Sequence, residues 1–176
     1  ADEFVYGRVA RVSREAPVLI LEYDSTEVLP GGAGNAANNV AAMGGSALLA
    51  TVIGRDEPGR RLLKSLHRRV NPRTVVRASK RGTTIKTRIL AGGIHSAKQQ
   101  IVRIDREPGW PVDEDVSRTF ASKIRTAIGE CDAVLLSDYG SGLVTPLLAE
   151  TIRRATAKRS RRRPIPVLVD SRYRLL

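Results

Sequence analysis

A glycine-rich segment, Gly31-Gly32-Ala33-Gly34-Asn35, has the residue types best suited to holding a small polyhydroxylated ligand. Residues without a Cβ let backbone amides approach hydroxyl groups closely, and the side chain of Asn35 offers a donor and an acceptor to neighbouring hydroxyls. The pattern is therefore typical of a sugar-binding turn. A glycine-rich turn followed by a helix that Asn35 caps explains the same residues without a ligand.

The same segment matches the dinucleotide-binding pattern Gly-x-Gly-x-x-Ala at Gly32, Gly34 and Ala37. A dinucleotide site needs an apolar strand directly before the glycines, so that the pyrophosphate meets a helix N-terminus. Residues 24–30 are mostly polar and end in Pro30, which predicts an interruption rather than a strand. The context therefore disfavours a dinucleotide site.

Asp138 and Asp170 each follow an apolar run, at 133–136 and 165–169, that predicts a buried strand. Helical patterns alternate with these strands, so we expect parallel βαβ units with ligand-binding carboxyl ends. Aspartates there suit a region that holds phosphate and Mg²⁺. An Asx turn or a helix cap after the strand explains each aspartate equally well.

The remaining periodicity indicates an α/β chain with a parallel sheet and a separate small β-structure. The run at 17–23 is too uniformly apolar for a half-exposed strand. Helices are predicted at 35–43 and 58–67, after Asp113 with an apolar stripe through Phe120 and Ile124, and after Thr145. Further strands are predicted at 3–6 and 47–53, and a hairpin at 83–90 and 99–104.

The net charge of +12 comes from 30 Lys and Arg residues against 18 Asp and Glu residues. The basic residues concentrate in 55–88 and 158–163, which could contact the phosphates of a nucleic acid. Neither cluster contains an aromatic residue for base stacking, so solvated surfaces explain them as well. A single cysteine, Cys131, excludes an internal disulfide and favours a reducing compartment such as the cytoplasm.

The spacing around the glycine-rich segment carries a resemblance to a known family. Six residues separate Ala37 from Gly44, and nine separate Gly44 from Gly54. With this spacing, the segment resembles the first signature of the ribokinase-like (PfkB) carbohydrate kinases. Residues 2–7, 13–18, 86–88, 99–105 and 136–139 are similar to the heptose-7-phosphate kinase branch, the kinase half of the bifunctional heptose kinase/adenylyltransferase.

The resemblance implies a Rossmann-like α/β domain whose N-terminal part spans residues 1–176, truncated at the C-terminus. It also implies a β-lid at about 3–23 and 83–105, and a homodimer in which two lids clasp. The implied reaction moves the γ-phosphate of ATP, with Mg²⁺, to the anomeric hydroxyl of D-glycero-D-manno-heptose 7-phosphate. A kinase of another sugar and a basic, non-catalytic nucleic-acid-binding α/β domain remain alternatives.

The resemblance also implies roles for particular residues. No Gly-Ala-Gly-Asp motif occurs in the sequence, so the implied base and nucleotide pocket are expected beyond Leu176. Ser141 stands where the family often has lysine, and Arg172 stands where the heptose branch typically has lysine. Substrate binding is implied for Asp2, Gly31, Gly32 and Asn35, and on the lid for Lys86, Arg88, Gln100 and Arg103. The resemblance places Asp138, Asp170 and Arg172 in the region of the phosphate and Mg²⁺. None of these residues is implied to bind the metal directly.

On the lid, alternate residues of a strand share a face, so Lys86 and Arg88 can point together at a phosphate already on the sugar. Salt-bridged or solvent-facing strand residues account for them equally well.

Overall fold

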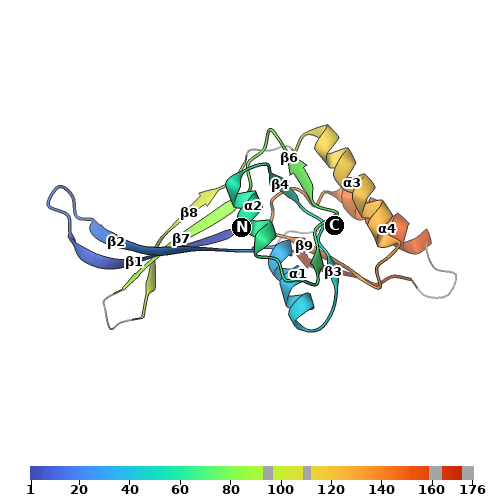
Figure 1. Cartoon of the computed structure of the whole chain (residues 1–176). Coiled ribbons are helices and arrows are strands. Elements are labelled where there is room, and N and C mark those ends of the chain that lie inside the picture. Colours follow the sequence, from blue (N-terminus) through green and yellow to red (C-terminus); the bar gives the residue numbers. More distant parts are fainter. Residues whose placement is uncertain (93–96, 109–111, 159–163, 172–176) are drawn as a thin grey trace.

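The computed structural model of the chain describes residues 1–92, 97–108, 112–158 and 164–171. It consists of an α/β body and a four-stranded sheet, the lid, that projects from one side of the body (Figure 1). Within the described ranges, no helix is both long and apolar enough to cross a membrane.

The lid is built from two antiparallel hairpins whose inner strands pair in parallel. The first hairpin is β1 (Asp2–Val12) with β2 (Leu19–Leu29), and the second is β7 (Ile85–Gly92) with β8 (Gln99–Arg106). The strand order is β2-β1-β7-β8, with Asp2 opposite Lys86 across the parallel pair. The hairpin predicted near 83–104 is therefore confirmed.

The prediction that the run at 17–23 is buried is wrong. Val18 and Leu19 are 56% and 44% exposed, and Tyr23 is 67% exposed. These residues lie in the outer part of the β1–β2 hairpin, which extends away from the body (Figure 1). An apolar run shows that a segment can pack, but no other element of the described chain covers this part of the lid.

The strands of the body pair in parallel, as predicted, but as three short pairs. The predicted strand at 47–53 is two strands separated by residues 49–51, and two partner strands of two and three residues were not predicted. The pairs are β3 (Ala47–Leu48) with β5 (Val70–Asn71), β4 (Val52–Gly54) with β6 (Val76–Ala78), and β9 (Val134–Asp138) with β10 (Val167–Ser171).

Helices cover both faces of these strands (Figure 1). On one face, the predicted stripes of two helices pack together and bury Phe120, Ile124 and Ile152 against Val76. On the other face, small residues of the first helix pack on the strands through Ala41. The helices are α1 (Ala33–Ala42), α2 (Glu57–Lys64), α3 (Glu114–Ile128) and α4 (Pro146–Lys158).

The helix starts show which side chains act as caps. Thr145 caps α4 as predicted, because its Oγ1 accepts a hydrogen bond from the Leu148 amide at 3.2 Å. Asp113 occupies the N-cap position of α3 without a side-chain capping hydrogen bond. The first residue of α2 is Glu57, one position earlier than predicted, because Asp56 caps that helix.

Asp56 ties the turn after β4 to the base of the lid. Its Oδ1 accepts hydrogen bonds from the Thr83 hydroxyl at 2.6 Å and the Gly59 amide at 3.0 Å, and its Oδ2 accepts one from the Thr83 amide at 2.7 Å. The Thr83 hydroxyl oxygen in turn accepts a hydrogen bond from the Gly54 amide at 3.0 Å. Thr83 lies just before β7, so one carboxylate fixes the direction in which the lid leaves the body.

Burial of Asp56 raises the pKa of its carboxyl, but hydrogen bonds from the Thr83 side chain and from the Thr83 and Gly59 amides outweigh burial and hold the pKa below its ordinary value of 3.8. A lowered folded pKa means that Asp56 contributes stability above the unfolded pKa. That contribution is lost as the pH falls through the folded pKa.

We expect Asp56→Ala to lower the free energy of unfolding by about 2 to 3 kcal/mol at neutral pH, because it removes a helix cap and leaves buried Thr83 groups without an acceptor. Denaturant unfolding at pH 7 and at descending pH below about 4 should show the difference from the parent shrinking. Glu57→Gln, which removes an adjacent exposed charge, is the control and should change stability by less than about 0.5 kcal/mol. A difference that stays constant with pH would contradict the role of the Asp56 carboxylate.

Candidate sugar-binding site

Asp2 and Gly31 meet where the lid joins the body. Asp2 begins β1, and Gly31 follows β2 in the loop that leads into α1. A Cβ placed on Gly31 would lie 2.5 Å from Asp2 Oδ2 and 3.2 Å from Asp2 Cγ, so any other residue here would displace the Asp2 carboxylate. Two residues separated by almost thirty positions in the sequence are therefore in direct contact.

Gly32, the next residue of this turn, lies against the body. Its φ of 50° lies in the left-handed region that favours glycine, and it occupies the N-cap position of α1. A Cβ at Gly32 would lie 3.8 Å from the ring of Tyr139, at the carboxyl end of β9. The Gly31–Gly32 turn thus lies between Asp2 on the lid and Tyr139 on the body.

Asn35 lies in the first turn of α1 and is exposed. It is the third residue of the helix, and the N-cap residue is Gly32, so the interpretation of Asn35 as the helix cap is wrong. Its exposed amide is therefore free of a capping role and stands beside the Gly31–Gly32 turn.

The strand that precedes the glycine turn differs from expectation. Residues 24–29 belong to β2, although the polar sequence predicted an interruption there. The reason is that the antiparallel partner β1 pairs with the full length of β2, with Val28 opposite Glu3. A dinucleotide site needs a parallel strand of a βαβ unit before the glycines, and β2 is a lid strand, so the argument against that site holds.

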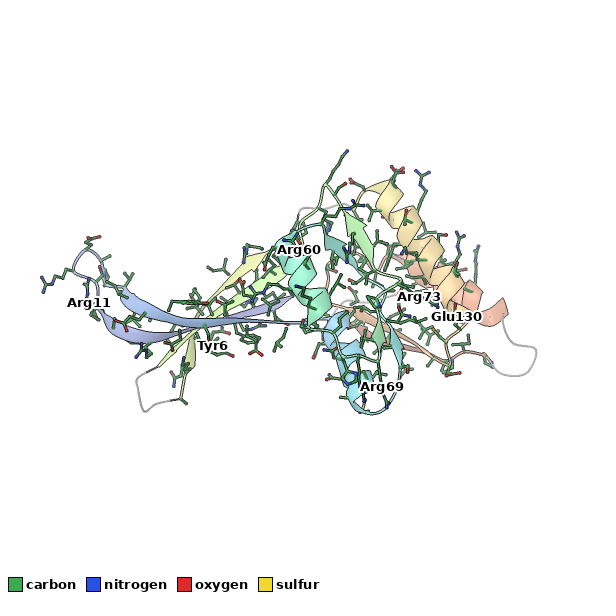
Figure 2. The ribbon with its side chains drawn as sticks, viewed as in Figure 1. Tyr6, Arg11, Arg60, Arg69, Arg73 and Glu130 are labelled. Carbon is green, nitrogen blue, oxygen red and sulfur yellow. The ribbon has the colours of Figure 1, made fainter. Side chains whose placement is uncertain are left out.

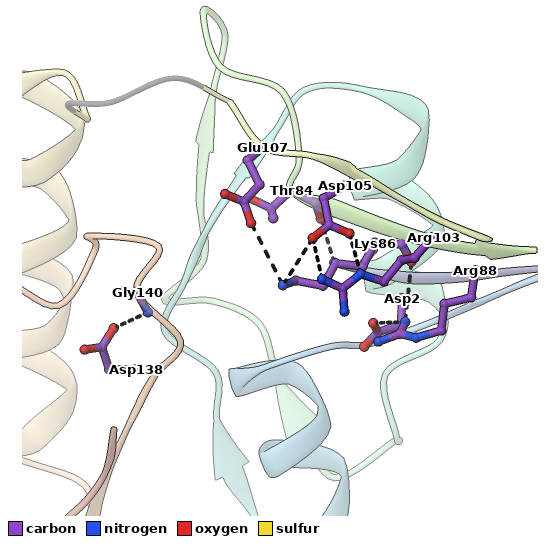
Figure 3. Close-up of polar contacts among 10 residues, drawn as sticks. Asp2, Thr84, Lys86, Arg88, Arg103, Asp105, Glu107, Asp138 and Gly140 are labelled. Carbon is purple, nitrogen blue, oxygen red and sulfur yellow. Dashed lines mark hydrogen bonds and ion pairs between the residues drawn. The ribbon is translucent and has the colours of Figure 1, made fainter. Parts of the chain in front are cut away.

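All four candidate residues on the lid lie on the face that carries Asp2. The register pairs Lys86 with Asp105, Arg88 with Arg103, and Leu90 with Gln100. Paired residues point to the same side of a sheet and alternate residues share a face. Lys86, Arg88, Gln100 and Arg103 therefore share one face with Asp2. Figure 3 shows Asp2, Lys86, Arg88 and Arg103 of this face.

The cations of this face are paired with carboxylates (Figure 3). Arg88 Nη1 donates a hydrogen bond to Asp2 Oδ1 at 2.5 Å, and both side chains are 24% exposed. Lys86 Nζ lies 3.9 Å from a carboxylate oxygen of Asp105 and 3.9 Å from one of Glu107. The salt-bridged interpretation of Lys86 and Arg88 is therefore confirmed, and each still has further N–H groups to offer a ligand.

Asp138 and Asp170 both lie at the carboxyl ends of parallel strands, as the sequence predicted. The register pairs Asp138 with Ser171 and Asp170 with Ser137, so the two carboxylates point to opposite faces of the strand pair. Asp138 is 6% exposed and its two oxygens accept hydrogen bonds from the Gly140 amide at 2.9 Å and the Ser171 hydroxyl at 3.0 Å. The Asx-turn interpretation of Asp138 is therefore confirmed.

The described residues do not form a site that fits Mg²⁺. No group of three or more His, Cys, Asp or Glu side chains in this part of the chain could hold a metal ion. Asp138 uses both oxygens in hydrogen bonds, and Asp170 points away from it. Arg172 lies outside the described residues, so its relation to these aspartates is not part of the structure.

Comparison with known proteins shows the family to which the chain belongs. The pfkB family carbohydrate kinase model matches residues 2–173. This chain belongs to the pfkB family of carbohydrate kinases. The match includes the lid, the glycine turn and the body, so the family extends over both parts of the site.

Similar proteins agree with the family. The chain is 41% identical over 175 residues to the bifunctional protein HldE of Gluconacetobacter diazotrophicus, covering 98% of this chain and 34% of that protein. It is 39% identical over 170 residues to HldE of Trichlorobacter lovleyi, covering 96% and 33%. The chain thus spans about a third of the length of these relatives.

Solved structures agree in fold. Arabidopsis thaliana ribokinase, complexed with ribose and ATP, superposes with a TM-score of 0.61 at 16% identity, over 96% of this chain and 49% of that chain. A possible 1-phosphofructokinase from Thermotoga maritima also gives a TM-score of 0.61 at 16% identity, over 99% and 52%. The ribokinase-type α/β fold predicted from the sequence is therefore confirmed.

Sequence reasoning missed three residues that lie at this candidate site. Tyr139 packs beside Gly32, Asp105 pairs with Lys86 and Arg103, and the Phe4 ring lies 5.3 Å below the Arg88 guanidinium. The alternation of Asp105 with Arg103 along β8 is a signal that could have placed both on the lid face. Nothing in the local sequence links Tyr139 to Gly32, because that contact joins distant segments.

We expect Gly31→Ala to lower the free energy of unfolding by about 1 to 3 kcal/mol, because the new Cβ would collide with the Asp2 carboxylate. The cost should largely disappear when Asp2→Ala is also present, since that change removes the colliding oxygen. A double-mutant cycle in denaturant measures the coupling. Gly82→Ala is the control, because its nearest neighbour would be 3.6 Å away; equal costs of Gly31→Ala in both backgrounds would contradict the contact.

Proposed function

We propose that this chain is the sugar-binding part of a kinase that transfers the γ-phosphate of ATP to a phosphorylated sugar. The observation that carries the proposal is the junction where Asp2 contacts Gly31 and shares a face with the lid cations. A carboxylate beside exposed backbone suits the hydroxyls of a sugar, and cations on the adjoining face suit a phosphate already on it. One ligand could contact both groups.

Arg88 orients the site in this proposal. It donates one hydrogen bond to Asp2, and its planar guanidinium has other N–H groups in the same fork. A sugar phosphate can accept from those groups while Asp2 accepts from a sugar hydroxyl. Arg88 would thereby set the distance between the recognised hydroxyl and the recognised phosphate.

The substrate we infer is D-glycero-D-manno-heptose 7-phosphate, phosphorylated at the anomeric hydroxyl. Its support is the 41% and 39% identity to relatives named HldE, together with the phosphate-compatible lid face. Ser141 stands where the family often has lysine, and Arg172 where the heptose branch typically has it, which favours a kinase of another sugar as the second candidate. Both candidates use the same junction.

ATP is the inferred phosphate donor, and the protein is expected to work in the cytoplasm, which suits its single cysteine. The Gly-Ala-Gly-Asp motif of the family is absent from residues 1–176, so ATP binding and activation of the acceptor hydroxyl are not assigned to these residues. Because the described residues do not fit Mg²⁺, no step is assigned to the metal here. The present residues bind and orient the sugar.

Calorimetric titration of this chain with a panel of sugars and sugar phosphates tests the proposal. Heptose 7-phosphate should bind more tightly than the unphosphorylated heptose. Asp2→Ala and Asn35→Ala should each weaken binding about tenfold or more, because each removes hydrogen bonds to sugar hydroxyls. ATP-dependent phosphorylation by the full gene product should rank the same sugars in the same order.

Asn39→Ala is the matched control for Asn35→Ala, since both are exposed asparagines of α1 and Asn39 lies one turn farther from the junction. It should bind sugar phosphates like the parent. Tighter binding of a different sugar phosphate would select the second candidate. Binding that ignores both Asp2→Ala and Asn35→Ala would remove the junction as the sugar site.

We also infer that two copies of the chain associate through their lids. The face of the lid opposite Asp2 carries Val102 and Ile104, which are 45% and 49% exposed, and Tyr23, which is 67% exposed. An apolar face of this kind on a projecting sheet is costly to leave in water. A second lid offers a matching apolar surface.

We expect Ile104→Glu to shift the chain from dimer to monomer in light-scattering measurements after size-exclusion chromatography, because it places a charge in the apolar lid surface. Gln99→Glu adds the same charge at the start of β8 and should leave the dimer intact. A parent chain that is monomeric at high micromolar concentration would contradict this association.

A further inference from the structure

A hollow at the carboxyl ends of β4 and β6 lies outside the junction of Asp2 and Gly31. Its volume is about 320 Å³, and it is lined by Arg55, Arg60 and Arg77 together with the turn that leads into α2. None of the residues of the sugar junction lines it. Arg60 lies on α2, on the side of the body nearest the lid (Figure 2).

The three arginines of this hollow have no carboxylate partner within the part of the chain that the structure describes. Glu57, the first residue of α2, pairs instead with Arg61 at 3.6 Å. Arg55 Nε donates a hydrogen bond to the backbone oxygen of Arg77 at 3.5 Å, which holds the Arg55 side chain over β6. Three cations gathered around one hollow repel one another, and an anion would relieve that repulsion.

Asp56 is the one acidic residue among those that line the hollow. Its oxygens are already engaged by the Thr83 hydroxyl, the Thr83 amide and the Gly59 amide. The Asp56 carboxylate therefore accepts its hydrogen bonds from Thr83 and Gly59, and none of the three arginines forms an ion pair with it. The hollow as a whole carries an excess of two positive charges.

We propose that this hollow binds a small molecule bearing one or two phosphate groups, separately from the sugar junction. Guanidinium groups bind phosphate oxygens in a bidentate fork, and three of them can surround a diphosphate. A volume of about 320 Å³ is at the small end of ligand sites, which suits a compact anion better than a nucleic-acid strand. The arginines are exposed, so binding weakens as salt screens the charges.

Occupancy of this hollow would act on the base of the lid. Gly54 and Gly59, which line the hollow, also belong to the hydrogen-bond network of Asp56 and Thr83. An anion that neutralises the arginines would stabilise the turn that carries this network. The melting temperature of the chain should therefore rise with ligand concentration.

Titration with pyrophosphate at constant ionic strength, followed by thermal melting and calorimetry, tests the proposal. The parent chain should bind pyrophosphate and melt at a higher temperature with it. Arg60→Gln and Arg77→Gln should each weaken binding about tenfold. Without pyrophosphate both variants should melt no lower than the parent, because each removes a repulsive charge.

Arg125→Gln, which removes an exposed charge from α3, is the matched control and should bind pyrophosphate like the parent. Arg88→Gln should also bind pyrophosphate like the parent. Loss of pyrophosphate binding in Arg88→Gln would place the ligand on the lid and overturn the proposal. An equal effect of Arg125→Gln would show non-specific attraction and overturn it as well. Much tighter binding of a single-stranded oligonucleotide through Arg60 and Arg77 would replace it with a nucleic-acid surface.

Discussion

The direction of the lid depends on one carboxylate, Asp56, and on two glycines that let the chain approach it. A Cβ at Gly54 would lie 2.7 Å from the Arg81 carbonyl oxygen, and one at Gly59 would lie 2.7 Å from the Gly54 carbonyl oxygen. With side chains at either position, Thr83 could not reach Asp56 at hydrogen-bond distance. Gly54 is thus explained by the packing of the lid base, while Gly31 is explained by its contact with Asp2 where the lid joins the body.

How far the sequence determines this fold depends on how local the signal is. The apolar stripes of α3 and α4 and the alternation in β7 and β8 repeat over many residues, and their elements are confirmed. Strands β5 and β6 span two and three residues, too few for any period to be visible. The run at 17–23 was wrongly expected to be buried because composition measures the tendency to pack, whereas exposure depends on which neighbour is present.

At the candidate site, too, the sequence predicts the types of residue, but only the fold determines their positions. Glycines beside an asparagine predict a tight, ligand-compatible turn, but only the fold brings Asp2 against Gly31 and Tyr139 against Gly32. The two aspartates at strand ends look equivalent in the sequence. A shift of one residue in register separates them, because Asp138 pairs with Ser171 and Asp170 with Ser137. Equivalent positions in a sequence pattern can therefore face opposite sides of a sheet.

The basic run at 55–88 is continuous in the sequence, but the fold divides its residues among several environments; Arg73, for example, pairs with Glu130, just after α3. On the lid, Lys86 and Arg88 are paired with carboxylates on the face that carries Asp2. Arg61 pairs with Glu57 along α2. Around the hollow, Arg55, Arg60 and Arg77 have no such partner among the described residues. A nucleic-acid surface needs cations spread along one accessible stripe, so this separation favours two compact anion-binding regions, one for a sugar phosphate and one for a small phosphate ligand.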